Sequence, residues 1–119
     1  MKNQPFHRRL GYAWRGLKAA WRTERNFRLQ CGATGGVVLL LLGLRPPAVW
    51  WAILLVCCGA VLTAELFNSA LERLLDHLHP TVHPAVALVK DLAAAAVLVL
   101  SLASLAVFAA FLVAGPWPN

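Results

Sequence analysis

Long uncharged stretches alternate with short charged segments along this 119-residue chain. Charged side chains are absent from residues 29–44, 46–64 and 92–119. The first stretch forms roughly 24 Å of helix, and Arg28 and Arg45 can extend to the headgroups on either side. The pattern predicts three membrane-spanning helices, at about residues 28–45, 48–78 and 84–114.

Proline and glycine mark the ends of these predicted helices. Pro46 and Pro47 favour a tight turn after the first helix, and Gly115 and Pro116 end the third. The second helix continues beyond its apolar part, through Glu65 and the charged turns that follow.

The N-terminal segment has a different pattern, typical of a helix that lies on a membrane. Its apolar side chains fall within an arc of about 100°: Phe6, Leu10, Ala13, Trp14, Leu17 and Trp21. The opposite side carries Arg8, Arg15, Lys18 and Arg22. We therefore predict an amphipathic surface helix at about residues 5–25.

Composition agrees with a membrane protein of one domain, residues 1–119. The chain is 60% hydrophobic and 13% charged, whereas a soluble domain is about one quarter charged. These values exclude a multi-domain enzyme and a disordered tail. The fold class that follows is an all-α membrane protein.

The positive charge is concentrated at one end of the chain. Eight of the 11 Lys and Arg residues lie between Lys2 and Arg28, which predicts a cytoplasmic N-terminus and a C-terminus outside. The cluster favours anionic lipid headgroups over nucleic acid, because no nucleic-acid-binding motif accompanies it. The first thirty residues also lack the apolar core of a cleaved signal peptide.

Histidine and cysteine give weaker signals. The spacing of His77, His79 and His83 matches no common zinc site, so we interpret them as loop residues. Three cysteines, Cys31, Cys57 and Cys58, lie in apolar stretches and are expected to be free thiols.

Carboxylates near or within the membrane are the strongest chemical signal. Four polar residues, Glu65, Asn68, Glu72 and Asp76, share an arc of roughly 80° on the second predicted spanning helix. Carboxylates are costly there, and three on one face repel one another unless a cation or proton lies among them. The stripe predicts a metal or metal-phosphate site, with a structural polar interface as the alternative.

Lys90 and Asp91 add a phosphate-binding candidate at the same membrane level. Lys90 could hold phosphate, and Asp91 could either orient Lys90 or cap the third spanning helix. The chain has no GxxxxGK[ST] loop and no kinase Gly-rich loop. If this protein uses ATP, it must therefore build the site from helix side chains and Mg²⁺.

Several motifs occur in order along the chain: GYAWRGL at 11–17, TERNFR at 23–28, AELFNSALE at 64–72 and KDLAAAAV at 90–97. Together they resemble the prokaryotic diacylglycerol kinase and undecaprenol kinase family. The resemblance implies a homotrimeric lipid kinase of the bacterial inner membrane, with active sites between subunits at the cytoplasmic interface. Such an enzyme transfers the γ-phosphate of ATP to the primary hydroxyl of a lipid alcohol.

The resemblance also implies roles for individual residues. Glu65 is the catalytic base, Glu24 and Glu72 bind the Mg²⁺ that bridges the ATP phosphates, and Asn68 supports the γ-phosphate. Lys90 neutralises phosphate charge, Asp91 orients Lys90, and Asp76 lines the nucleotide site. The surface helix closes over the nucleotide, with Arg8 and Tyr12 as further contacts.

The lipid acceptor is a finer question. Ala93, Ala94 and Gln30 differ from the diacylglycerol branch, and the Glu24–Arg28 run resembles the undecaprenol branch more closely. We therefore favour undecaprenol over diacylglycerol. Two other classes are a small transporter, which predicts four spans, and a passive assembly protein, which predicts that Glu65→Gln is harmless.

Overall fold

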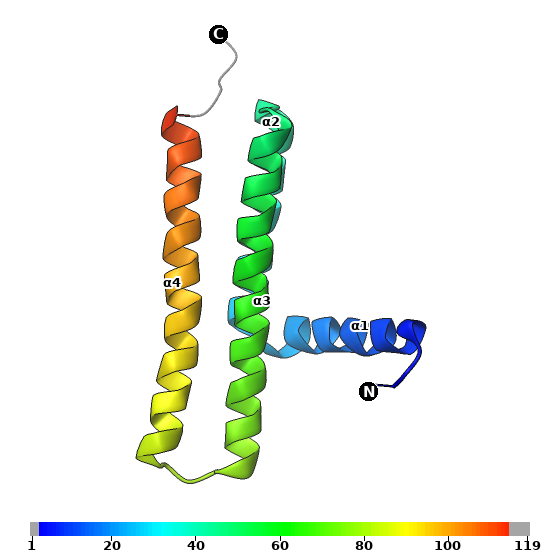
Figure 1. Cartoon of the computed structure of the whole chain (residues 1–119), viewed down its shortest axis with the longest axis vertical. Helices are drawn as coiled ribbons and strands as arrows, with labels where there is room; N and C mark the ends of the chain where they lie inside the picture. The colour runs from blue at the N-terminus through cyan, green and yellow to red at the C-terminus, as the bar shows by residue number, and fades with distance from the viewer. Residues whose placement is uncertain (1–2, 115–119) are drawn as a thin grey trace.

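The computed structural model describes residues 3–114, and regular structure within that range is entirely helical (Figure 1). The four helices are α1 Phe6–Thr23, α2 Arg25–Leu44, α3 Ala48–Leu78 and α4 Pro84–Ala114. The last three are long and apolar enough to cross a membrane. The expected all-α fold, with one amphipathic helix before three apolar helices, is confirmed.

A single residue separates α1 from α2. The backbone of Glu24 is extended, with φ −113° and ψ 104°, and the chain changes direction there. The helix α2 therefore begins at Arg25, three residues before the predicted start at 28. The predicted helix end at Gly115 and Pro116 lies outside the described residues, as does Lys2.

The three long helices form an elongated bundle in which α3 packs against both α2 and α4 (Figure 1). The helix α1 runs crosswise to this bundle and packs against α2. At 1.5 Å per residue, the 31-residue helices α3 and α4 are about 46 Å long, which exceeds a hydrocarbon core of ~30 Å. Both helices are therefore longer than a single span requires, and their charged residues lie toward their shared turn.

The apolar core lies at the opposite end of the bundle, near the α2–α3 turn. Leu41, Leu54 and Phe111 are fully buried there, one from each long helix. The rings of Trp50 and Phe111 have centroids 5.1 Å apart. The carboxylates of α3, together with Lys90 and Asp91 of α4, lie on the other side of this core, toward the α3–α4 turn.

The amphipathic face of α1 is not covered by the rest of the described chain. Phe6, Leu10, Trp14, Leu17 and Trp21 are all exposed. An exposed apolar stripe beside cationic residues is the arrangement expected of a helix that inserts one face into a membrane surface.

Candidate functional site

Glu65 is the buried carboxylate of the described chain, with 4% of its surface exposed. It lies on α3, where the side-chain amide of Gln30 on α2 donates a hydrogen bond to its Oε2 over 3.5 Å. Glu72 and Glu24 are close enough to repel it electrostatically. The fold therefore brings together three of the carboxylates that the sequence predicts for the site.

Asn68 lies one turn from Glu65 and connects the polar stripe internally. Its Nδ2 donates to Oε1 of Glu72 over 3.3 Å. Its Oδ1 is buried and has no hydrogen-bond partner within residues 3–114. A buried oxygen without a donor is costly, so this atom is available for a cation or for a donor on a ligand.

Glu24 occupies the corner between α1 and α2, where Arg73 of α3 binds it. The guanidinium donates from Nε over 3.1 Å and from Nη2 over 2.9 Å, both to Oε1 of Glu24. Nη2 also donates to the hydroxyl of Thr23. Sequence reasoning missed Arg73, because it lies about 100° around the helix from Glu72 and carries no motif signal.

Lys90 on α4 forms an ion pair with Asp76 on α3. Asp91 is exposed and makes no ion pair within the described chain, so the structure does not join Lys90 to Asp91. Consecutive helical residues point about 100° apart, which explains why these two side chains do not face each other. Capping by Asp91 is also wrong, since α4 begins seven residues earlier at Pro84.

Arg8 and Tyr12 are not brought to the carboxylates. They lie in the first half of α1, which points away from α3 and α4 in Figure 1. Arg8 donates to Gln4 over 3.3 Å, and the guanidinium of Arg15 lies 4.9 Å from the Tyr12 ring centroid. A closed surface helix would have to move relative to this arrangement.

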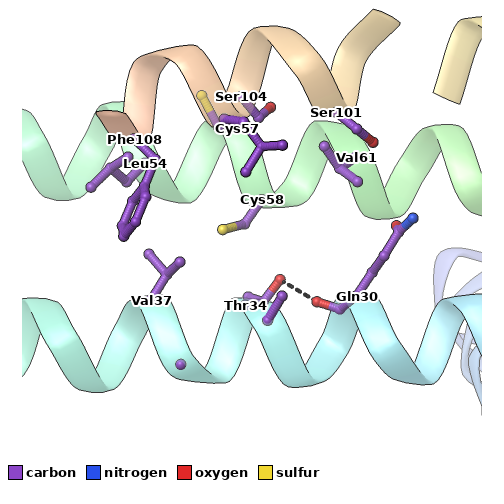
Figure 2. A pocket seen from close by; sticks show the side chains of 13 residues that line it. Gln30, Thr34, Val37, Leu54, Cys57, Cys58, Val61, Ser101, Ser104 and Phe108 are labelled. Atoms are coloured by element: carbon purple, nitrogen blue, oxygen red, sulfur yellow. Dashed lines mark hydrogen bonds between the residues drawn. The ribbon is translucent and has the colours of Figure 1, made fainter. Parts of the chain in front are cut away.

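A groove of about 490 Å³ opens between α2, α3 and α4, and its lining includes Gln30, which contacts Glu65. Figure 2 shows that Gln30 forms one end of it, while apolar side chains such as Val37, Leu54 and Phe108 line the other end. Thr34 donates its hydroxyl to the backbone carbonyl of Gln30 over 2.9 Å. The side-chain Oε1 of Gln30 is buried and has no partner within residues 3–114.

A second cavity of about 490 Å³ lies between the C-terminal half of α1 and α3. Its apolar lining includes Leu17 and Leu66, and its polar lining includes Glu24, Ser69 and Arg73. The carboxylate cluster is thus flanked by two cavities, one reaching into the span and one beneath the surface helix.

The donor types of the cluster fit Mg²⁺, which prefers oxygen and commonly takes one or two carboxylates together with substrate phosphates. Glu24 and Glu72 provide carboxylates, and Asn68 provides an unpartnered oxygen. No group of three His, Cys, Asp or Glu side chains within residues 3–114 forms a complete metal site. Phosphate oxygens would therefore complete the coordination.

Within residues 3–114, the histidines and cysteines form no metal-binding group with these carboxylates. His77 lies in the last turn of α3, so its interpretation as a loop residue is wrong. Nδ1 of His83 accepts a hydrogen bond from the backbone N–H of Ala85 over 3.1 Å, at the start of α4. The expected free thiols are confirmed for Cys31, Cys57 and Cys58.

Comparison with known proteins gives a consistent answer. Residues 11–112 match the model of the prokaryotic diacylglycerol kinase family. The diacylglycerol kinase of Escherichia coli (strain K12) is 34% identical over 89 residues, which cover 75% of this chain and 73% of that protein. The undecaprenol kinase of Bacillus subtilis (strain 168) is 31% identical over 99 residues, covering 83% and 80%. A diacylglycerol kinase of Helicobacter pylori (strain ATCC 700392 / 26695) is 32% identical over 90 residues, covering 76% and 70%.

Proposed function

Because the chain belongs to the prokaryotic diacylglycerol kinase family and is a multi-pass bacterial membrane lipid kinase that uses ATP, we propose that its preferred acceptor is undecaprenol. The similar proteins include both a diacylglycerol kinase and an undecaprenol kinase. The Glu24–Arg28 run, together with Gln30, supports the undecaprenol branch. Phosphorylation of diacylglycerol is the second candidate, supported by the similarity to the enzyme from E. coli.

The observation that carries this proposal is the position of Glu65. Its carboxylate is buried on a membrane-spanning helix, where a lipid hydroxyl can approach it without leaving the bilayer. We propose that Glu65 is the general base, which accepts the proton of the acceptor hydroxyl as the oxygen attacks the γ-phosphorus and the bond from that phosphorus to the bridging oxygen breaks, so that ADP leaves. A carboxylate buried in a membrane is rare in a purely structural role, which supports a catalytic one.

We propose that the acceptor chain binds in the groove that Gln30 lines. It is apolar along most of its length and polar at Gln30, which contacts Glu65. A polyprenyl chain lying in the groove would bring its terminal hydroxyl to this polar end, and the acyl chains of a diacylglycerol would bring its glycerol hydroxyl there. The second N–H of the Gln30 side-chain amide can donate a hydrogen bond to the hydroxyl oxygen and orient it, which leaves the hydroxyl proton for Glu65.

Phosphoryl transfer requires alignment and charge neutralisation more than covalent participation by the protein. We propose that Glu24 and Glu72 hold Mg²⁺, which when bound offsets the charge of the ATP phosphates. Asn68 supports the γ-phosphate, and Lys90 neutralises its developing charge. Asp76 orients Lys90, a role for which the ion pair between them is the support.

We further propose a homotrimer whose active sites lie between subunits on the cytoplasmic side. Near Glu65, one chain offers candidate ligating oxygens from three residues, Glu24, Asn68 and Glu72, and its cavities are open to the outside. A neighbouring subunit could supply the missing walls around ATP. The eight cations between Lys2 and Arg28 support a cytoplasmic N-terminus. Crosslinking in native membranes, with a trimer as the expected product, tests the assembly.

A lipid kinase assay tests the function. Purified enzyme in mixed micelles receives labelled ATP, Mg²⁺ and either undecaprenol or diacylglycerol, and labelled lipid is measured. Faster labelling of undecaprenol is expected, whereas a preference for diacylglycerol would replace the proposed acceptor with the second candidate.

The same assay tests Glu65 as the base. We expect Glu65→Gln to lower kcat by 10²–10⁴-fold, the usual contribution of a general base. Thr63→Val is the matched control, because Thr63 is exposed and its hydroxyl bonds only to the carbonyl of Gly59 on the same helix. Full turnover by Glu65→Gln would remove Glu65 as the base and leave the family assignment intact.

A further inference from the structure

Arg73 makes the ion pair that joins the α1–α2 corner to α3 within residues 3–114. Both of its hydrogen bonds to Glu24 go to the same oxygen, Oε1. The second carboxylate oxygen, Oε2, is therefore left for another ligand. Glu24 keeps 25% of its side chain exposed, so a cation from the aqueous side can reach it.

The contact also restrains Glu24, the single residue that separates α1 from α2. Glu24 has an extended backbone between two helices, so its side chain has no helical neighbours to fix its direction. The bond from Arg73 to the Thr23 hydroxyl holds the adjacent residue as well. Arg28 fixes the same corner from the other side, by donating to the backbone carbonyl of Trp21 over 2.7 Å.

We propose that Arg73 is a positioning residue for the divalent cation, which holds Glu24 through Oε1 so that Oε2 is presented as a metal ligand. The proposal rests on the proposed role of Glu24 in binding Mg²⁺. Residues that hydrogen-bond a ligating carboxylate commonly change metal affinity by 10–100-fold when they are removed. An arginine suits this role, because its planar fork can direct two donors at one carboxylate.

The direction in which cation affinity changes when Arg73 is replaced distinguishes a positioning role from simple charge repulsion. Arg73 carries a positive charge, which by itself repels a nearby cation. If only this charge mattered, replacing Arg73 by a neutral residue would strengthen binding of the divalent cation. If Arg73 orients Glu24, the same replacement weakens binding.

Binding of Mn²⁺ to the full-length enzyme in detergent micelles measures this directly. Free Mn²⁺ is titrated by electron paramagnetic resonance in the presence of a non-hydrolysable ATP analogue, so that turnover does not enter the readout. We expect Arg73→Ala to raise the Kd for Mn²⁺ about tenfold. Arg73→Lys should give an intermediate value, since an ammonium restores the charge but not the fork.

Arg25→Ala is the matched control, because it removes a positive charge beside Glu24 from a residue with no ion pair in the described chain. Its Kd is expected to stay within twofold of the wild type. An unchanged or lower Kd in Arg73→Ala would overturn the proposal. If Arg73→Ala does not fold, as judged by circular dichroism, Arg73→Gln keeps much of the side-chain volume and carries the same two outcomes.

Glu24→Gln separates failure of this proposal from failure of the proposed function. If Glu24→Gln binds Mn²⁺ as tightly as the wild type, Glu24 is not a metal ligand and both proposals fail at this residue. If Glu24→Gln weakens binding while Arg73→Ala does not, only the positioning role of Arg73 is overturned.

Discussion

The side-chain amide of Gln30 on α2 donates a hydrogen bond to Oε2 of Glu65 on α3, across 3.5 Å of a largely apolar helix interface. Gln30 thereby gives the buried carboxylate its polar contact with a neighbouring helix. The amide also lines the groove proposed for the acceptor chain. Gln30 would thus contact both the acceptor hydroxyl and the proposed base, Glu65.

Replacing Gln30 should therefore affect both the base and the acceptor. A hydrogen bond to a charged group contributes about 1.5–3 kcal/mol, and this long contact belongs at the lower end. We expect Gln30→Ala to reduce kcat/KM for the lipid about tenfold while KM for ATP changes little. Leu29→Ala, at an exposed neighbouring position on α2, is the control. Loss of ATP affinity instead of lipid turnover would contradict the placement of the acceptor at Gln30.

The ion pair between Lys90 and Asp76 predicts which carboxylate controls the lysine. Asp76→Asn and Lys90→Met should each raise KM for ATP, and the double variant should be no worse than Lys90→Met alone. The coupling energy between the two substitutions should be about 0.5–1 kcal/mol. The side chains of Asp76 and Lys90 are 66% and 35% exposed, respectively, so solvent screens the ion pair. Asp91→Asn combined with Lys90→Met should be additive. Stronger coupling to Asp91 than to Asp76 would show that Asp91 orients Lys90 after all.

Asn68 provides a prediction about the metal requirement. Its buried Oδ1 has no partner within residues 3–114, and an oxygen in that state suits a ligand of the magnesium-ATP complex. We expect Asn68→Ala to raise the Mg²⁺ concentration for half-maximal activity about tenfold. This is the size of change expected when a contact that supports a metal site is lost. Phe67→Ala, at an exposed position on the adjacent helix face, should leave that concentration unchanged. An unaltered Mg²⁺ requirement in Asn68→Ala would place the amide outside the metal-phosphate site.

The helices of this protein could be predicted from sequence because each has its own local signal. Uncharged length identified the spans, and the 3.6-residue period placed Glu65, Asn68 and Glu72 on one face of α3. The hydrogen bond from Asn68 to Glu72, four residues apart, follows from the same geometry.

Contacts between helices left no comparable signal. Arg73 and Glu24 are 49 residues apart, and their contact depends on where the chain breaks at Glu24. The rotation of α4 about its own axis likewise decides that Lys90 faces α3 and Asp76. The 3.6-residue period shows which residues share a face of one helix. It does not show how that helix is rotated about its axis relative to its neighbour.

The core at the α2–α3 turn predicts that stability and catalysis can be perturbed separately. Phe111 is 1% exposed and stacks at a tilt against Trp50, with centroids 5.1 Å apart. In a membrane the transfer of apolar surface from lipid to protein gains little, so Phe111→Ala loses chiefly packing contacts. We expect a loss of about 2 kcal/mol, which is below the roughly 3–5 kcal/mol that Phe→Ala substitutions cost in the cores of water-soluble proteins. Unfolding by added sodium dodecyl sulfate, followed by circular dichroism, measures this loss.

The position of this core gives the same variant a second expected outcome. Phe111 packs with Leu54 in the core near the α2–α3 turn, and Glu65 lies about three turns farther along α3, roughly 16 Å from Leu54. Phe111→Ala enzyme that is still folded should therefore keep its KM for ATP and its Mg²⁺ requirement. Leu102→Ala, at an exposed position on the same helix, should change stability by less than about 0.5 kcal/mol. A large drop in kcat without lowered stability would mean that packing at this end sets the geometry of the acid cluster. In that case α3 and α4 would transmit the structural change from the core to the acid cluster, because both helices extend from one to the other.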